Sequence, residues 1–195
     1  MDIYTAIKKE KLSLKGFITF MIMIAIFLPI ALFLTGLFNM FYLFFLAFIE
    51  FLIVIAIILR FNSYKVEYKC NNNKLSFRTG IFTSKSLVFC DRVVLVHTNK
   101  SDYDMEIIVI TNLAFKNKML KPVVPNFLKR YPEIKKEYLK IQEFSPDKSY
   151  YFQVIRKGGL KKYLLLDCIY KNCVKAVYTD YSIQNIKIAR GQTIV

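Results

Sequence analysis

The chain lacks the residues and motifs on which most catalytic sites depend. Its 195 residues include a single histidine, His97, and none of the G-x-S-x-G, Walker or G-x-G-x-x-G patterns of nucleophile elbows and phosphate-binding loops. His97 falls in a predicted strand, where a structural role is more common than a catalytic one. We therefore predict a protein that is not an enzyme and that carries no cofactor.

The spacing of metal-binding cysteines is also missing. The four cysteines form no C-x-x-C pair, and one histidine does not complete a zinc site. Each cysteine lies in an apolar run, so we expect reduced thiols inside a core, in agreement with a cytoplasmic domain. These residues are Cys70, Cys90, Cys168 and Cys173.

Glycine, proline and acidic residues are all scarce. The chain has six glycines and five prolines but 55% hydrophobic residues, a composition too apolar for a disordered protein. Lys and Arg number 29 against 14 Asp and Glu, and the excess is uneven. Residues 1–63 carry five basic and three acidic residues, which leaves 24 and 11, or +13, for residues 64–195. We infer a membrane module (1–62) followed by a basic domain (63–195) that attracts polyanions.

Charge is almost absent from two long runs near the N-terminus. Gly16–Gly36 contains no charged residue, and Leu37–Leu59 contains only Glu50. At 1.5 Å per residue, each run reaches the ~30 Å of a bilayer's hydrocarbon core. A signal peptide would be shorter and would end in a small-x-small cleavage site. We predict a transmembrane hairpin with spans at about 16–36 and 37–60.

The charges flanking the hairpin predict its orientation. Four lysines precede the first span, Arg60 and Lys65 follow the second, and the connecting turn is uncharged. The positive-inside rule then places both termini in the cytoplasm, so we expect a multi-pass protein of the plasma membrane. Ile3, Tyr4, Ile7 and their lysine neighbours predict a short amphipathic helix on the inner leaflet.

Glu50 lies near the middle of the second span and has two interpretations. An acid inside a membrane marks a functional contact, here a hydrogen bond between helices or protomers. Alternatively, the apolar residues of the span, at roughly −5 to −10 kcal/mol in total, simply tolerate one acid at about +3 kcal/mol.

After Ser63 the pattern changes to the period of two that is typical of strands. Residues 64–70 and 74–78 alternate around Asn71–Asn73, which predicts a hairpin, and further strands are expected at 87–90, 93–97, 105–111 and 149–156. The strand at 105–111 is apolar on both faces and therefore central. Residues 98–104 are expected to form a loop. Helical spacing follows at 160–178, with Lys162 on the polar face, and at 181–190, with Ile183 and Ile186 inward. The order predicts an α+β domain with C-terminal helices at 160–190.

A basic segment interrupts this pattern at about 112–148. It contains three prolines, and Pro132 begins a predicted helix. Together with the first strand hairpin, it supplies the residues that we predict to bind an anionic surface or a partner. These are Lys74, Arg78, Lys116, Lys118, Lys121, Lys129 and Arg130.

The hairpin and residues 64–111 resemble the bacterial pleckstrin-homology-like (PH-like) membrane proteins, the YdbS-like family. The resemblance rests on the strand–turn–strand Tyr64–Arg78, the R-x-G-I-F stretch Arg78–Phe82 and the D-R-V-x-x-V stretch Asp91–Val96. It implies a sandwich-like or barrel-like antiparallel domain closed by a helix, which acts as a scaffold or lipid-surface binder. The basic-x-Arg element of phosphoinositide binding is missing, since Ser76 stands two residues before Arg78. Residues after about 112 depart from the family pattern.

Three hypotheses of function follow. The first is a membrane-anchored scaffold or binding module whose basic PH-like domain docks on a protein partner, a second copy or the anionic inner leaflet. The second is a membrane-tethered nucleic-acid binder or conjugation accessory, since aromatic residues interleave with the lysines of the basic segment; their spacing is that of a helical core, so nucleic acid is not the expected partner. The third is a small immunity or channel-type membrane component that acts through Glu50.

Overall fold

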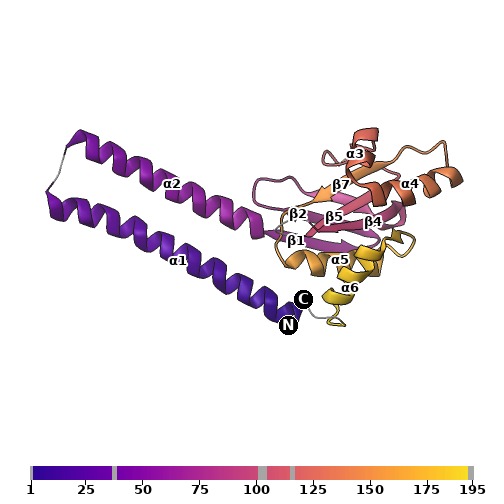
Figure 1. Cartoon of the computed structure of the whole chain (residues 1–195), viewed down its shortest axis with the longest axis horizontal. Helices are drawn as coiled ribbons and strands as arrows, with labels where there is room; N and C mark the ends of the chain where they lie inside the picture. The colour runs from indigo at the N-terminus through magenta and orange to yellow at the C-terminus, as the bar shows by residue number, and fades with distance from the viewer. Residues whose placement is uncertain (1, 37–38, 101–104, 115–116, 193–195) are drawn as a thin grey trace.

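The computed structural model describes residues 2–36, 39–100, 105–114 and 117–192 of the chain. Two long helices project from one end of a mixed domain (Figure 1). Helix α1 spans Ile3–Thr35 and α2 spans Met40–Tyr64. Gly36 ends α1 in the left-handed conformation, as expected for a glycine at a helix C-terminus. The predicted helical hairpin is confirmed.

Both helices are long and apolar enough to cross a membrane, and their most apolar windows are almost fully exposed. The core helix of a soluble protein would be buried. Instead, each helix buries only a narrow stripe against the other, with Ile53 as the most enclosed residue, and leaves phenylalanines such as Phe27 and Phe44 uncovered. Such surfaces are suited to lipid and indicate membrane association.

The N-terminal segment differs from the prediction. It forms no separate helix on the leaflet, because α1 is continuous from Ile3. Ile3, Ala6 and Ile7 are buried, and the start of α1 lies beside the domain (Figure 1). The apolar residues that predicted an amphipathic helix on the leaflet are instead buried against the protein.

A three-stranded antiparallel sheet follows α2 directly. It consists of β1 (Val66–Asn71), β2 (Lys74–Thr79) and β3 (Ser86–Phe89), in that order. Asn72 and Asn73 have positive φ values of 47° and 60°, which confirms the asparagine turn. The first strand starts later than predicted because α2 continues to Tyr64.

A second sheet has the order β6-β7-β5-β4-β8. Its strands are β4 (Val93–Lys100), β5 (Met105–Thr111), β6 (Lys121–Pro122), β7 (Tyr151–Ile155) and β8 (Val177–Tyr178). All pairs are antiparallel except β4 and β8. The central place of β5 is confirmed. The loop predicted from Thr98 was wrong at its start, since β4 continues to Lys100; residues 101–104 lie outside the described residues.

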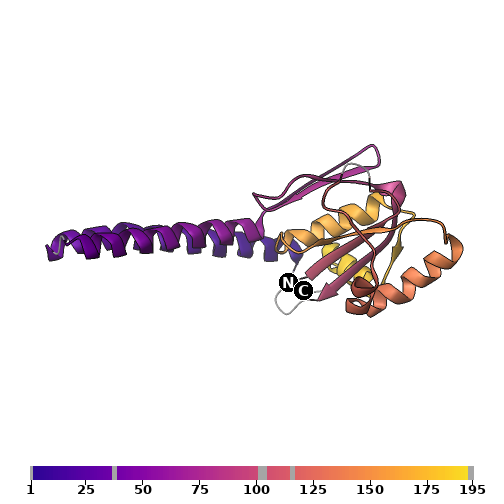
Figure 2. The same ribbon diagram turned by 90° about the horizontal axis from the view of Figure 1, so that it is seen from above.

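Helices cover both faces of this second sheet. On one face, α3 (Pro125–Arg130) and α4 (Pro132–Phe144) enclose a core with Leu95, Ile108 and Ile110. On the other face, α5 (Lys161–Asn172) packs between the two sheets, and α6 (Asp180–Ala189) lies against α5 and β4. Figure 2 shows the three-stranded sheet and α4 on opposite sides of the domain. The predicted α+β class is confirmed.

Three predictions about the C-terminal helices were wrong. The helix expected over 160–178 ends at Asn172, because its chain turns at Cys173 and pairs with β4 as β8. Lys162 is buried rather than solvent-facing. In α6, Ile186 is buried as predicted but Ile183 is exposed, and Ser182 takes the inward position by donating a hydrogen bond to the Val96 carbonyl (2.9 Å).

Candidate membrane-facing site

The predicted binding residues fall into two separate groups. Lys74 and Arg78 lie on β2, where Lys69 and Lys85 line the same shallow grooves on the outer face of the small sheet. Sequence reasoning missed Lys69 and Lys85, although the alternation of β1 places Lys69 on that face. The second group lies on and before α3 and is exposed: Lys118, Lys121, Lys129 and Arg130. Lys116 lies outside the described residues.

Arg78 shapes a loop. Its guanidinium donates hydrogen bonds to the carbonyls of Ile81 and Thr83, the latter at 2.9 Å. The R-x-G-I-F stretch is therefore a self-contained turn in which the arginine holds the backbone that follows it. Arg78 contributes positive charge to the surface, and two of its five N–H donors are used within the chain.

This loop is fixed to the C-terminal end of α2. Asn62, in the last turn of α2, accepts a hydrogen bond from the Ile81 N–H at 2.6 Å, and the Gly80 N–H donates to the Lys65 carbonyl at 2.7 Å. Gly80 has φ +88°, and a Cβ there would lie 2.4 Å from the Asn62 Oδ1 atom, so only glycine fits. The contact holds Phe82, which is 76% exposed, near the C-terminal end of α2.

The start of α1 is fixed to the domain by a second contact. Both carboxylate oxygens of Glu10 accept the Leu160 N–H at 3.1 Å, at the N-terminus of α5. A Cβ on Gly159 (φ +51°) would lie 2.5 Å from this carboxylate. We call this contact, made by Glu10 with Gly159 and Leu160, the α1 latch. The N-terminal part of α1 and the C-terminal end of α2 are thus each hydrogen-bonded to the domain.

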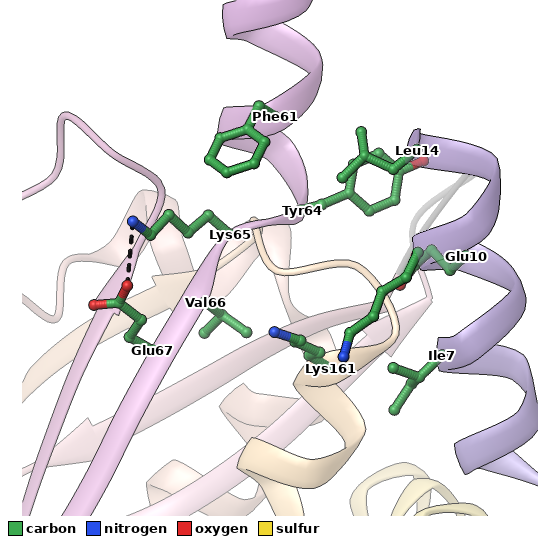
Figure 3. A pocket seen from close by; sticks show the side chains of 10 residues that line it. Ile7, Glu10, Leu14, Phe61, Tyr64, Lys65, Val66, Glu67 and Lys161 are labelled. Atoms are coloured by element: carbon green, nitrogen blue, oxygen red, sulfur yellow. Dashed lines mark ion pairs between the residues drawn. The ribbon is translucent and has the colours of Figure 1, made fainter. Parts of the chain in front are cut away.

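A pocket of about 230 Å³ lies between these two attachments. Figure 3 shows side chains from α1, α2, β1 and α5 converging on it. Its apolar part is formed by Ile7, Leu14, Phe61, Tyr64 and Val66. Its charged part contains three lysines and two glutamates: Lys11, Lys65, Lys161, Glu10 and Glu67.

We call this the junction pocket. Some of the charged side chains that line it form ion pairs and others do not. Lys65 forms an ion pair with Glu67 at 3.2 Å, and Glu10 belongs to the α1 latch. Lys11 and Lys161 have no ion-pair partner among the residues that the structure describes. Arg60, the residue of α2 that precedes Phe61, lies over the rings of Phe17 and Tyr64, with its guanidinium carbon 5.7 and 5.0 Å from the ring centroids. The result is a basic, half-apolar recess where the two long helices meet the domain.

His97 has the structural role that the sequence predicted. Its Nδ1 atom lies 2.9 Å from Thr179 Oγ1 and joins β4 to the start of α6. Tyr181 meets the ring edge-on, and the nearest carboxylate oxygen, on Glu133, is 3.9 Å from Nδ1. Burial lowers the pKa of His97 to about 4, so the folded protein holds it neutral.

Below neutral pH, His97 should make the protein less stable. Its pKa is about 4 when folded and ~6.5 when unfolded, so the unfolded chain binds the proton first and stability falls as the pH drops from ~6.5 towards 4. Between pH 7.5 and 5.5 we expect a loss of about 1.4 kcal/mol that a His97→Asn variant does not show. Urea unfolding of the two detergent-solubilised proteins at several pH values measures how the free energy of unfolding of each changes with pH. Parallel slopes for the two proteins would contradict the assignment.

The four thiols meet in the main core, which spacing along the sequence did not reveal. Cys90 and Cys173 are buried, Cys70 and Cys168 are half-buried, and all are free. The sulfur atoms of Cys70 and Cys90 are 4.0 Å apart. Within the described ranges, no group of three or more His, Cys, Asp or Glu side chains has an arrangement that could hold a metal ion. Cys90 and Cys173 are core side chains, as predicted, whereas Cys70 and Cys168 are only partly buried and pack against that core.

Glu50 faces α1 within the hairpin. Its Oε1 atom is buried and has no hydrogen-bond partner among the described residues. The neighbouring positions on this face, Ile49 and Ile53, are apolar. The predicted hydrogen bond from Glu50 to the other helix is not seen in the described part of the chain, and a contact between protomers stays a prediction.

Comparison with known proteins found no counterpart for this arrangement. No protein-family model, curated protein or solved structure matches the chain.

Proposed function

We propose that this chain is a membrane-anchored, non-catalytic binding module that holds its basic domain against the anionic inner leaflet. The hairpin crosses the plasma membrane with both termini in the cytoplasm. The observation that carries the proposal is the double attachment of the hairpin to the domain, through the α1 latch and through Asn62 with Ile81. A domain tied at both helix ends cannot swing far from the bilayer.

The dimensions of the helices support this placement. Helix α1 has 33 residues, or ~50 Å, whereas α2 has 25, or ~38 Å. A hydrocarbon core takes ~30 Å, so α1 extends well beyond it on the side where it meets the domain. Lys15 and Arg60 come at the ends of the apolar runs of the two helices, as expected where a hairpin leaves the lipid tails.

The surface beside the hairpin has the chemistry of a leaflet contact. Phe82 projects from the loop attached to α2, and the outer face of the small sheet carries Lys69, Lys74 and Lys85. An aromatic side chain flanked by lysines suits the headgroup region, where each basic residue contributes about 1 kcal/mol. The leaflet contact is thus assigned to this end of the domain.

We also propose that the domain is a variant of the PH-like fold. The two packed sheets, antiparallel except for the β4–β8 pair, and the helix α5 that closes their shared core support this assignment. Strand β6 and helices α3 and α4 form an insertion within the basic segment 112–148 and add a layer on the far face of the second sheet.

The basic group on this insertion is proposed to meet an acidic protein partner. Lys121 and Arg130 line a groove of about 490 Å³ together with Arg156. Nucleic acid is less suited to it, because the aromatic residues needed for base stacking are in the core: Phe127, Tyr131 and Tyr138 are buried.

Leaflet contact can be measured with one substitution, since the chain contains no tryptophan. Phe82→Trp in the full-length protein, reconstituted in nanodiscs, should emit at shorter wavelength and be quenched by brominated lipids. The quenching should increase when phosphatidylglycerol replaces half of the phosphatidylcholine. Phe144→Trp, at an 89% exposed position at the end of α4, is the matched control and should not be quenched. Equal quenching of the two variants would refute the proposed placement.

A further inference from the structure

We infer that the junction pocket binds one anionic phospholipid, with the lipid phosphate between Lys11 and Lys161 and an acyl chain along Leu14, Phe61 and Tyr64. This inference deepens the proposed function and rests on its placement of the hairpin in the membrane. It replaces a diffuse attraction to charge with a defined site for a single lipid molecule.

The charge of the pocket requires an anion. Lys11 and Lys161 come from elements 150 residues apart in the sequence, yet they line the same recess. Figure 3 shows Lys161 directed into it from the start of α5. Two ammonium groups in one recess repel each other, and a phosphate between them removes that repulsion. Of the two carboxylates in the lining, Glu67 pairs with Lys65 and Glu10 accepts the Leu160 N–H, so the three lysines and two glutamates leave a formal charge of +1.

The N-terminus of α5 also lies at the pocket. Lys161 is the first residue of α5, a helix of 12 residues, so the positive end of the helix dipole lies at the pocket. The Leu160 N–H at the same helix end is already satisfied by Glu10. The Glu10 carboxylate offsets the dipole at this helix end, so the positive charge available to an anion comes from Lys11 and Lys161.

The depth of the pocket in the membrane fits a lipid headgroup. Lys11 precedes Gly16, where the apolar run starts, by five residues, or ~7.5 Å along α1. The headgroup layer on each side of a bilayer is about 5–8 Å thick. Lys11 therefore lies at the level of the phosphates, and Leu14 and Phe61 lie on the side of the acyl chains.

The size and polarity of the pocket distinguish a lipid from a free phosphate ion. Its volume of about 230 Å³ equals roughly seven or eight water molecules, enough for a phosphodiester with part of its glycerol. An inorganic ion would leave the apolar wall of Leu14, Phe61 and Val66 in contact with water. A lipid covers that wall with its chain, which continues into the bilayer beside the hairpin.

Native mass spectrometry of the intact protein, released from phosphatidylglycerol-containing nanodiscs, tests this site. Wild type should retain one phosphatidylglycerol molecule that K11Q/K161Q loses. Each lysine near an anionic lipid is worth about fivefold in affinity, so the double variant should bind about thirtyfold more weakly. The matched control is K118Q/K121Q, which removes two exposed lysines of the insertion and should retain the lipid.

Three results would overturn the inference. These are equal lipid retention by wild type and K11Q/K161Q, equal retention of phosphatidylcholine and phosphatidylglycerol by wild type, and displacement of the lipid by millimolar inorganic phosphate. The Phe82→Trp quenching experiment separates the two proposals. Quenching without lipid retention leaves the leaflet placement standing and removes only the lipid site, whereas loss of quenching removes the placement itself.

Discussion

Replacement of Lys162 with methionine is expected to lower the free energy of unfolding by about 3–6 kcal/mol. Lys162 is fully buried and donates hydrogen bonds to the carbonyls of Met105, at the start of β5, and Arg156, just after β7, the latter at 2.6 Å. A hydrogen bond to a charged group contributes about 1.5–3 kcal/mol, and methionine fills the space but leaves both carbonyls unsatisfied. One side chain thus connects α5 to two strands of the second sheet.

Thermal unfolding in detergent, followed by circular dichroism, measures this effect. A domain of about 130 residues should lose roughly 10 °C or more in Tm. Lys175→Met, which changes an exposed lysine beyond the end of α5, is the matched control and should leave Tm unchanged. If Lys162→Met were as stable as this control, the buried ammonium would not be what holds α5 in place.

Removal of the Glu10 carboxylate is expected to release the first turns of α1 from the domain. In Glu10→Ala, the Leu160 N–H loses its acceptor, and a charge-assisted bond of about 1.5–3 kcal/mol is lost. The open state of these turns should then be about 10- to 100-fold more populated. Trypsin cleaves after Lys8, Lys9 and Lys11 only when the helix opens, so the cleavage rate should rise by the same factor.

Two further variants make the interpretation of this experiment specific. Gly159→Ala places a methyl group 2.5 Å from the carboxylate and should accelerate cleavage in the same way without altering any charge. Glu143→Ala removes an exposed acid of α4 and should have no effect. Cleavage of Glu10→Ala at the wild-type rate would show that the buried residues Ile3, Ala6 and Ile7 hold α1 without the latch.

Much of the architecture could be predicted because local patterns decide it. Two uninterrupted apolar runs around Gly36 suffice for the hairpin, since helices satisfy their own backbone in lipid. Alternation around Asn72 and Asn73 was enough for the first strand pair, and the apolar faces of Met105–Thr111 indicated its central place. The proline at residue 132 correctly marked the start of α4.

The errors occurred where a residue's environment comes from distant parts of the chain. Lys162 looks solvent-facing in a helical pattern, but in the fold its ammonium group donates hydrogen bonds to the carbonyls of Met105 and Arg156, which favour its burial. Val177 and Tyr178 continue a helical spacing, but the free edge of β4 offers them strand hydrogen bonds. Likewise, Ser182 replaces Ile183 in the core because the Val96 carbonyl accepts its hydroxyl.

The sequence by itself determined the apolar helical hairpin, the basic charge of the domain and its α+β class, because these depend on composition and on period along the chain. Tertiary structure alone decided where the charges act. It separated Lys74 and Arg78 from the lysines of the insertion, used Arg78 within a loop, and brought Lys11 together with Lys161. The physical reason is that a charge pattern does not encode distance: residues 11 and 161 become neighbours only when the Glu10 carboxylate meets the Leu160 N–H and draws α1 against α5.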